Sequence, residues 1–435
     1  MAGSTGAQPQ GSAAAGAQSV TDPAAAAQAV APGPGRSVAE PEPGAEQSAA
    51  AVPGQRAGVA VGPLLEPFED VHRIAVLRGG GLGDLLFAMP AVEALAAAYP
   101  EASVSLLGMP LHDSLLRGRG TPVQEVHLLP LAEGIRPPQP GEEPDPAAAR
   151  SFLARMRRRR FDLAVQLHGG GRNSNPFLLQ LGARHTAGAA TEDAPRLERT
   201  LSYRYYQNEV MRALEIAGLA GAPAVTLRPR LAVLPEEREL ARERIGQSAR
   251  LLVVHPGATD PRRRWPAARF AQTVARAVLE SGAHAVIVGD ASERRLTSAV
   301  ARQAAKLAGP RRASRILNLG GRLTPSELVG LISLASVFLG NDSGPRHLAE
   351  ALGVRTVGIY WVGNLINAGP LGRQEHRVHL GWTVRCPVCG ADLTQVGWTA
   401  ERCAHDPSIV AEVDVADVYE DVAQLMATTP PERGR

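Results

Sequence analysis

The sequence predicts an α/β protein with two Rossmann-like parallel-sheet domains that face each other across a central cleft. From about Val71 onward, apolar runs of strand length alternate with amphipathic helical stretches. The strands are short and almost wholly apolar, as in Leu251–Val254, which is typical of parallel sheets covered by helices on both faces. Such a series occurs twice in 435 residues, a length that suits two or three domains.

In the first series, strands and helices follow one another as a parallel sheet requires. The pattern predicts strands at Ile74–Leu77, Ser103–Leu107 and Phe161–Leu167, and helices at Leu85–Ala98 and Ala147–Arg160. The Pro-rich stretch Arg136–Pro146 interrupts this half and is expected to form a surface loop.

The second series begins after Leu227–Leu231, which we interpret as the interdomain linker. The pattern predicts strands at Leu251–Val254, Ala285–Val288, Arg315–Leu319, Val337–Gly340 and Thr356–Tyr360. The expected helices are Pro266–Ser281, Leu296–Ala308, one from the capping box at Thr324 to about Ala335, Pro345–Leu352, and a last one from Val415.

Residues 1–66 consist mainly of Ala, Gly, Pro, Gln and Ser with few large apolar side chains. Such a segment cannot bury enough surface to offset its ordering entropy, so we expect a disordered tail. The predicted domains are then residues 67–228 and residues 229–435.

The composition excludes several classes of protein. Hydrophobic residues at 44% and charged residues at 20% fit a globular protein with true cores, and a net charge of +3 gives no support for nucleic-acid binding. No stretch approaches the roughly 18 apolar residues of a membrane span, and the N-terminus lacks the pattern of a secretory signal. The three cysteines are clustered, which argues against a secreted disulfide framework. We therefore expect a cytoplasmic protein.

A glycine-rich turn, RGGGLGDLLFAMP, follows the first strand. A dinucleotide-binding fingerprint would carry a third small residue where Asp84 stands, and an acid at the end of the second strand, which instead ends in Leu107-Gly-Met-Pro110. Asp84 is either the N-cap of a helix starting at Leu85 or a carboxylate at the strand edge that faces the cleft.

Two turns of the second series carry charged groups. A strand delivers His255, and the loop Arg262–Arg264 follows, either as solvated charge or as cations that neutralise a pyrophosphate. After the next strand, Asp290 and Glu293 are placed to accept hydrogen bonds from ribose hydroxyls, or serve only as first-turn charges of a helix.

The turn Asn341-Asp-Ser-Gly344 also lies between a strand and a helix. The backbone N–H groups of Ser343 and Gly344 at the helix N-terminus suit an anion. Alternatively, Asp342 or Ser343 only caps the helix, and His347, one turn further, is an ordinary surface histidine.

Near the C-terminus, a C-x2-C pair is followed by C-x-H. Three thiolates and one imidazole could hold zinc, but the spacing matches no common zinc finger. The alternative is three reduced structural thiols. The residues concerned are Cys386, Cys389, Cys403 and His405.

Together these segments resemble glycosyltransferase family 9, the ADP-heptose:lipopolysaccharide heptosyltransferases, from about Arg73 to Val422. The resemblance rests on four motifs in order: Arg78 with Gly83-Asp84 and Pro90; His255-Pro-Gly257 with Arg263-x-Trp265-Pro266; Gly289 with Glu293; and Asn341-Asp-Ser-Gly344 with His347. It implies a GT-B-type fold, with an N-terminal acceptor domain and a C-terminal nucleotide-sugar donor domain.

The resemblance also implies roles for individual residues. Asp84 would be the general base and Arg263 would stabilise the leaving diphosphate. The donor side would be formed by Glu293, Asp342, Ser343, Gly344 and His347, and the acceptor side or its loops by Gly81, Gly83 and Arg172. An arginine and a helix N-terminus can stabilise a leaving group without a metal, so neither a metal nor a cofactor is expected.

The function implied is that of an inverting, metal-independent glycosyltransferase that moves a sugar, with heptose expected, from an ADP-linked donor to a glycan or lipid-linked acceptor. At most peripheral membrane association is expected. Two alternatives stay open: a nucleotide-sugar epimerase or hydrolase of the same fold, and a non-catalytic protein that binds nucleotide sugars.

Overall fold

Six parallel strands form the first sheet, in the order β3-β2-β1-β4-β5-β6. The computed structural model describes residues 59–138, 141–246, 250–396 and 399–428. The strands of this sheet are β1 (Arg73–Leu77), β2 (Ser103–Gly108), β3 (Val123–Leu128), β4 (Leu163–Gln166), β5 (His185–Ala190) and β6 (Arg199–Ser202).

The second sheet repeats this arrangement, in the order β12-β11-β10-β7-β8-β9. Its strands are β7 (Leu251–His255), β8 (His284–Ile287), β9 (Ile316–Asn318), β10 (Val337–Asn341), β11 (Arg355–Trp361) and β12 (His376–Gly381). Counted within each half, both sheets have the 3-2-1-4-5-6 order of a doubly wound Rossmann sheet. The prediction of two Rossmann-like parallel sheets is confirmed.

Helices cover both faces of the first sheet because successive strand residues point to opposite faces. Ile74 and Val76 join an apolar cluster with α1 and α5, whereas Ala75 and Leu77 pack with α3 and α4. The helices of this half are α1 (Leu82–Ala98), α2 (Pro110–Leu116), α3 (Pro146–Arg159), α4 (Ser174–Leu179) and α5 (Glu209–Leu219).

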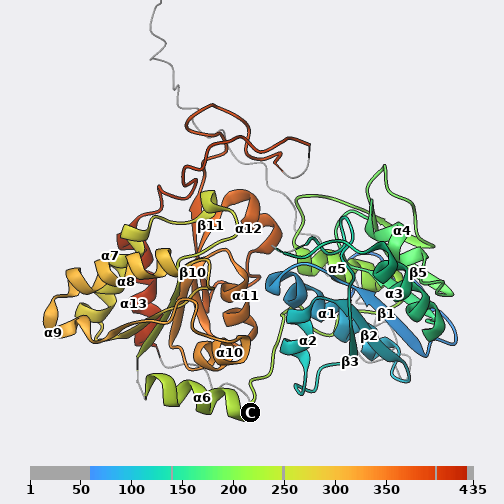
Figure 1. The fold of residues 1–435 in the computed structure, drawn as a ribbon, viewed down its shortest axis with the longest axis horizontal. Coiled ribbons are helices and arrows are strands. Elements are labelled where there is room, and N and C mark those ends of the chain that lie inside the picture. The colour runs from blue at the N-terminus through green and yellow to red at the C-terminus, as the bar shows by residue number, and fades with distance from the viewer. Residues whose placement is uncertain (1–58, 139–140, 247–249, 397–398, 429–435) are drawn as a thin grey trace, which may run out of the picture. The chain divides into compact units, whose positions relative to one another are not determined.

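The second sheet is covered in the same way (Figure 1). Leu252 and Val254 pack with α7, α8 and α13, whereas Leu251 and Val253 belong to the same apolar cluster as α1 and α5, together with α10 and α11. The two halves therefore share one core cluster. The helices are α6 (Pro235–Ile245), the 3-10 turn η1 (Pro261–Arg263), α7 (Ala267–Glu280), α8 (Arg294–Ala308), α9 (Pro310–Ala313), α10 (Pro325–Ser333), α11 (Gly344–Ala351), α12 (Val362–Ala368) and α13 (Val415–Ala427).

The end of the predicted tail differs from expectation. Residues 59–66 lie against the first half: Val59 pairs with Ala224, and the N–H of Leu65 donates to the carbonyl of Gly218 at 3.0 Å. A Cβ on Gly218 would stand 2.4 Å from the Pro63 carbonyl oxygen, so a glycine permits this contact. Backbone hydrogen bonds hold residues 59–66 in place, and the amino-acid composition does not predict such bonds. Residues 1–58 of the predicted tail lie outside the described residues.

The predicted domain boundary at 228/229 falls between α5 and α6, and it stays a prediction. Among the described residues, no helix combines the length and the apolar character needed to cross a membrane.

Candidate functional site

Four turns hold most of the polar groups of interest, and they follow β1, β4, β7 and β10. In each sheet these are the two neighbouring strands at which the strand order reverses, where ligands of open α/β sheets bind. Gly79–Gly81 and His168 lie at this point of the first sheet, and His255 and Asn341 lie at the corresponding point of the second.

The turn after β1 requires its glycines. Gly80 has φ = +86°, and a Cβ there would lie 2.5 Å from Asp84 Oδ2. A Cβ on Gly79 would lie 2.6 Å from the carbonyl oxygen of Ile135. The turn is therefore tightly folded around the Asp84 carboxylate.

Helix α1 begins at Leu82, not at the predicted Leu85, so Asp84 is the third helical residue and not the N-cap. Its Oδ2 accepts a hydrogen bond from the backbone N–H of Gly81 at 2.8 Å, which satisfies a helix N-terminal donor. The interpretation of Asp84 as the N-cap is therefore wrong: Gly81 is the N-cap, and Asp84 accepts from its backbone N–H from the third helical position. The side chain is still 47% exposed, so the carboxylate is also open to a ligand.

A buried arginine fixes this carboxylate. Arg78 Nη2 lies 2.6 Å from Asp84 Oδ1, and Arg78 Nε donates to the Asp84 carbonyl at 2.9 Å. The same guanidinium donates to the carbonyl of Leu167 and lies 3.6 Å from Glu209. Arg78 therefore orients Asp84 relative to the turns after β1 and β4.

In the second half, His255 connects two candidate donor-binding residues. Its Nδ1 lies 3.0 Å from Ser343 Oγ, and its Nε2 lies 3.0 Å from Glu293 Oε2. Burial alone would raise the pKa of Glu293, but hydrogen bonds from His255 and from the Asp290 N–H hold it below its usual value. A Cβ on Gly257 would stand 1.6 Å from Glu293 Oε1, so this carboxylate needs a glycine opposite it.

Asp342 forms a second network, in which Asp342 and His347 are buried and Arg263 is partly exposed. Its Oδ1 lies 2.9 Å from His347 Nε2, and its Oδ2 lies 3.1 Å from Arg263 Nη1. Burial would raise the pKa of Asp342, but His347, Arg263 and Arg346 together keep it below its usual value. Burial and the nearby Arg346 lower the pKa of His347, so this imidazole is neutral near pH 7.

The three consecutive arginines have three different environments. Arg262 is buried and paired with Asp260 at 2.5 Å. Arg263 contacts Asp342, and Arg264 donates to the carbonyl of Ala258 and lines a cavity. Solvated charge is therefore the wrong description for Arg262, which is structural.

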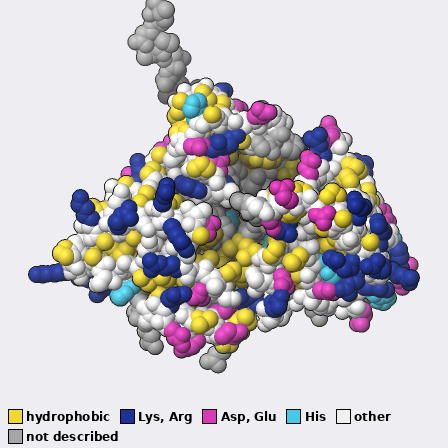
Figure 2. Space-filling model, viewed as in Figure 1, with side chains coloured by type: hydrophobic (Ala, Val, Ile, Leu, Met, Phe, Trp, Pro, Cys, Tyr) yellow, Lys and Arg dark blue, Asp and Glu magenta, His cyan; other side chains and the backbone are white. Residues whose placement is uncertain are grey.

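That cavity, which we call the donor cavity, has a volume of about 490 Å³. Figure 2 shows the surface hollowed in the middle of the view. The polar lining of the donor cavity comes from the second half and includes Glu293, Ser343, Gly344 and Arg264, whereas the first half contributes Leu82, Leu111 and Leu115. Asp342 and His347 do not line the cavity; they are buried next to Ser343, where they pair with each other and support the cavity wall.

The N-termini of α1 and α11 meet beside this cavity because two glycines let them approach. A Cβ on Gly83 would lie 3.1 Å from the His347 ring, and one on Gly344 would lie 3.0 Å from the Cβ of Leu82. The ring of Phe87 on α1 also contacts that of His347 edge-on, at 4.6 Å between centroids. The Asp84 turn and the Ser343 turn are therefore neighbours.

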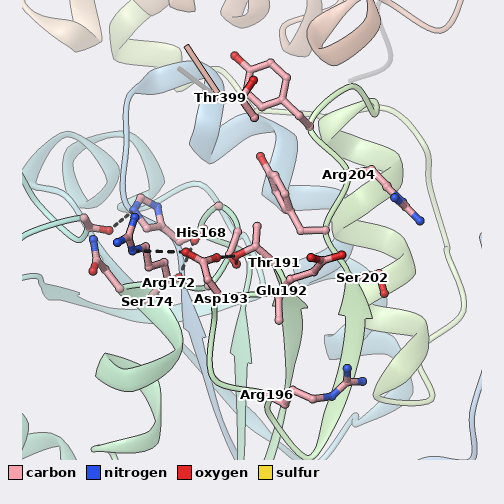
Figure 3. Close-up of a pocket in the computed structure, with 18 residues that line it drawn as sticks. His168, Arg172, Ser174, Thr191, Glu192, Asp193, Arg196, Ser202, Arg204 and Thr399 are labelled. Carbon is pink, nitrogen blue, oxygen red and sulfur yellow. Dashed lines mark hydrogen bonds and ion pairs between the residues drawn. The ribbon is translucent and has the colours of Figure 1, made fainter. Parts of the chain in front are cut away.

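A second, larger cavity of about 820 Å³ opens in the first half (Figure 3). We call it the acceptor-side cavity; its lining includes Arg172, Asp193, Arg204 and Thr399. It adjoins the glycine-rich turn through His168, whose Nδ1 accepts from the Gly79 N–H at 3.2 Å and whose Nε2 donates to the Gly134 carbonyl at 3.0 Å. Arg172 is largely exposed at its rim and lies 3.5 Å from Asp193.

The comparisons with known proteins agree with this architecture. A family model described as glycosyltransferase family 9 (heptosyltransferase) matches residues 149–387, more than half of the chain. The chain belongs to glycosyltransferase family 9. The transferase is 25% identical over 325 residues to lipopolysaccharide heptosyltransferase 2 of Salmonella typhimurium, over 71% of this chain and 88% of that protein.

Two solved structures resemble the transferase. The E. coli ADP-heptose LPS heptosyltransferase II has a TM-score of 0.61 at 19% identity, over 82% of this chain and 98% of that one. The family 9 glycosyltransferase of Veillonella parvula DSM 2008 has a TM-score of 0.64 at 17% identity, over 84% and 99%. These likenesses concern the fold, and with the two six-stranded sheets they confirm the expected GT-B type.

The sequence did not single out three residues that the structure places centrally in the transferase. His255 and Arg78 were noted only as parts of motifs, although they hold Ser343, Glu293 and Asp84 in place. Arg264, one of three arginines of equal appearance in the sequence, is the one that lines the donor cavity. Their positions after β1 and β7, the strands at the switch points, were the available signal.

The structure also gathers the four residues near the C-terminus that were considered for zinc. The ligand atoms of Cys386, Cys389, Cys403 and His405 lie within 4.8 Å of one another.

Proposed function

We propose that this glycosyltransferase is an inverting enzyme that transfers heptose from ADP-heptose to a hydroxyl group of a glycan or lipid-linked acceptor in lipopolysaccharide assembly. The observation that carries the proposal is the meeting of the Asp84 turn with the helix N-terminus at Ser343 and Gly344 beside the donor cavity. The names of the relatives, lipopolysaccharide heptosyltransferase 2 and ADP-heptose LPS heptosyltransferase II, support the choice of donor and acceptor class.

In the proposed reaction, an acceptor hydroxyl in the acceptor-side cavity attacks the anomeric carbon of the donor sugar. Asp84 takes the hydroxyl proton, a new carbon–oxygen bond forms, and the bond between the anomeric carbon and the diphosphate breaks with inversion. Arg78 holds one oxygen of Asp84 and the Gly81 N–H holds the other, so the base is oriented before the acceptor arrives.

The diphosphate leaves with the bonding electrons and needs positive charge. Pro345 has no N–H, and the Arg346 N–H donates to the Ser343 carbonyl at 3.0 Å. The N–H groups of Ser343 and Gly344 stand at the N-terminus of α11, where the helix dipole favours an anion. Arg264 in the wall and Arg263 beside Asp342 supply cationic groups, so the chain itself provides the electrostatic stabilisation of the leaving group.

Glu293 lies in the donor cavity, where it is suited to accept hydrogen bonds from ribose hydroxyls. His255 holds its Oε2, which leaves Oε1 for the ligand. Asp342 and His347 support the donor site through Arg263 and through packing, without lining the cavity themselves.

The decisive experiment compares Asp84→Asn with Asp113→Asn; Asp113 lies on α2 and pairs with the exposed Arg117. Transfer is followed by mass spectrometry of the product, and ADP affinity by calorimetry. General-base catalysis is worth about 10²–10⁴-fold, so we expect Asp84→Asn to lose transfer by that factor while its ADP affinity stays within a few-fold. Asp113→Asn should keep both.

Transfer by Asp84→Asn at the wild-type rate would contradict the assignment of the base. Sugar release from the donor without any acceptor product would indicate a hydrolase, and ADP binding without turnover on any acceptor would indicate a binding protein. Thermal shifts with ADP, UDP and GDP test the nucleotide, with the largest shift expected for ADP. Comparison of Arg263→Gln with Arg264→Gln shows which of the two substitutions lowers kcat more, and hence which arginine contributes more to stabilising the leaving group.

A further inference from the structure

The segment between β12 and α13 contains all three cysteines of the chain. In Figure 1 it forms the orange-red loops that rise above the second sheet. Although the segment lacks helices and strands in its described residues 382–396 and 399–414, four side chains capable of binding a metal converge there. The transfer reaction proposed above makes no use of them.

The spacing of these side chains suits a single small ion. Their three sulfur atoms and one ring nitrogen lie within 4.8 Å of one another. Zinc–sulfur bonds of about 2.3 Å and zinc–nitrogen bonds of about 2.0 Å in a tetrahedron place the ligand atoms roughly 3.5–4 Å apart. Only small side-chain adjustments would bring this cluster to zinc geometry.

Two further features of the cluster point to an ion. His405 Nδ1 is buried and has no hydrogen-bond partner, which is costly for a polar atom. All three cysteines are free thiols, so no disulfide accounts for their proximity.

We propose that one Zn²⁺ ion binds in a closed, structural site formed by Cys386, Cys389, Cys403 and His405. Three thiolates and one imidazole are a complete tetrahedral set for zinc, which leaves no open position for a substrate. The thiol protons are released to solvent on binding, as for other thiolate sites. This site is separate from the chemistry of transfer, and its existence does not depend on the proposed function.

The position of the site gives it a structural consequence. The same segment contacts the first half, where Tyr206 donates to the carbonyl of Thr394 and Tyr205 donates to that of Val396 at 3.2 Å. Thr399 lines the acceptor-side cavity. We therefore expect the ion to fix the wall of that cavity, a part of the inference that rests on the proposed function.

The segment is also attached to the arginine loop next to the donor cavity. The Ser408 hydroxyl donates to the carbonyl of Arg264 at 2.7 Å, and the Ile409 N–H donates to that of Arg262 at 2.8 Å. These contacts follow directly after His405 in the chain. The ion thus fixes a segment that touches both cavities.

The first test is the metal content of the full-length protein, purified without chelators, by plasma mass spectrometry. We expect about one zinc per chain, released when a mercurial modifies the thiols. Cobalt substituted for zinc should show the intense visible absorption of tetrahedral thiolate coordination. Iron in place of zinc, octahedral cobalt spectra, or three fast-reacting thiols without metal would each overturn the proposal.

Variants locate the ligands. Cys389→Ser changes an exposed thiol, so the fold should persist while the zinc content becomes substoichiometric. His405→Ala should do the same, and His284→Ala, which alters an exposed histidine on β8, is the matched control that keeps the zinc. Full zinc content in Cys389→Ser would contradict the ligand set.

The consequence for the acceptor is measured separately. In Cys389→Ser we expect faster hydrogen exchange around residues 199–206 and a higher KM for the acceptor, with the Kd for ADP within twofold to threefold of the wild type. If zinc is bound but neither exchange nor the acceptor KM changes, the structural consequence is wrong while the metal site stands. Because metal content requires no activity, this result cannot be confused with a failure of the proposed reaction.

Discussion

Replacing Asp342 by asparagine tests how the buried network beside Ser343 supports transfer. Arg346 Nη2 donates to His347 Nδ1, so the proton of the neutral ring is on Nε2, which donates to Asp342 Oδ1. Arg263 donates to the other oxygen. Both oxygens of Asp342 are therefore acceptors, and an amide offers only one oxygen. In Asp342→Asn one donor must face an NH₂ group.

The structure sets the size of the effect. A hydrogen bond to a charged group is worth about 1.5–3 kcal/mol, and breaking a fully buried ion pair costs about 3–5 kcal/mol. Arg263 is 23% exposed and can turn toward water, which reduces the cost. We expect a loss of about 2–3 kcal/mol in unfolding free energy, and a fall in kcat of about 10–100-fold because Arg263 is no longer held in place.

The assay follows ADP release and product formation at pH 7, with urea unfolding in parallel. Since the pKa of Asp342 is held below its usual value, its pairing is lost only as the pH falls through that lowered pKa, so the assay is far from this transition. The matched control is Asp421→Asn. Asp421 also bridges an arginine and a histidine, Arg377 at 3.3 Å and His379 at 3.0 Å, but it lies on α13.

Asp421→Asn should lose stability and keep its kcat. If Asp342→Asn unfolds more easily but turns over at the wild-type rate, the positioning of Arg263 is irrelevant to transfer and the reasoning fails. An equal loss of kcat in both variants would show that the effect is general destabilisation.

Three other changes have expected outcomes. Gly80→Ala places a Cβ 2.5 Å from the Asp84 carboxylate at a φ of +86°, so transfer should fall sharply, whereas Gly118→Ala, at φ = +76° with open space around it, should show the backbone strain of about 1 kcal/mol alone in urea unfolding. His112 is buried and its pKa is lowered to about 4, so stability is lost as the pH falls from about 6.5, and His112→Gln should remove on the order of 2 kcal/mol of the difference in unfolding free energy between pH 7 and pH 5. Arg119→Met leaves the buried carboxylate of Glu237 on α6 without its partner and should lower the unfolding free energy by about 3–5 kcal/mol in the same assay. A much smaller loss would show that water reaches Glu237 in the variant.

The periodic pattern of the sequence predicted the elements that carry long apolar runs. Strand β7 was expected at Leu251–Val254 and spans Leu251–His255. Helix α7 was expected at Pro266–Ser281 and spans Ala267–Glu280. Strand β5, His185–Ala190, was not predicted because its alanines and glycine have little strand preference. Its conformation comes from pairing with β4, which is a tertiary interaction.

The sequence predicted which turns matter but not what their side chains do there. Arg262, Arg263 and Arg264 are chemically identical, and only the packing of the loop buries one, pairs one with Asp342 and directs one to the donor cavity. The link from Ser343 through His255 to Glu293 joins residues 88 and 38 positions apart, so no local pattern could predict it. Whether these residues act as assigned stays a prediction until the variants are measured.

Two aspartates offset the electrostatic repulsion between the N-termini of α1 and α11. The N-terminus of a helix carries a partial positive charge, and α1 and α11 approach each other at Gly83 and Gly344, so these ends repel unless anions stand nearby. Asp84 supplies one carboxylate in the first turn of α1, and Asp342 supplies another just before α11.

The two carboxylates differ in what remains available to a substrate. Asp342 is buried, and its two oxygens accept from Arg263 and His347, so its role is to position protein side chains and not to contact a substrate. Asp84 uses one lone pair of each oxygen for Arg78 and Gly81, and a carboxylate has about four such sites. Because it is also half exposed, Asp84 can cap α1 and accept a proton from a ligand at once. Helix capping and general-base catalysis are therefore compatible roles of one side chain, and the tight glycine turn is what allows both.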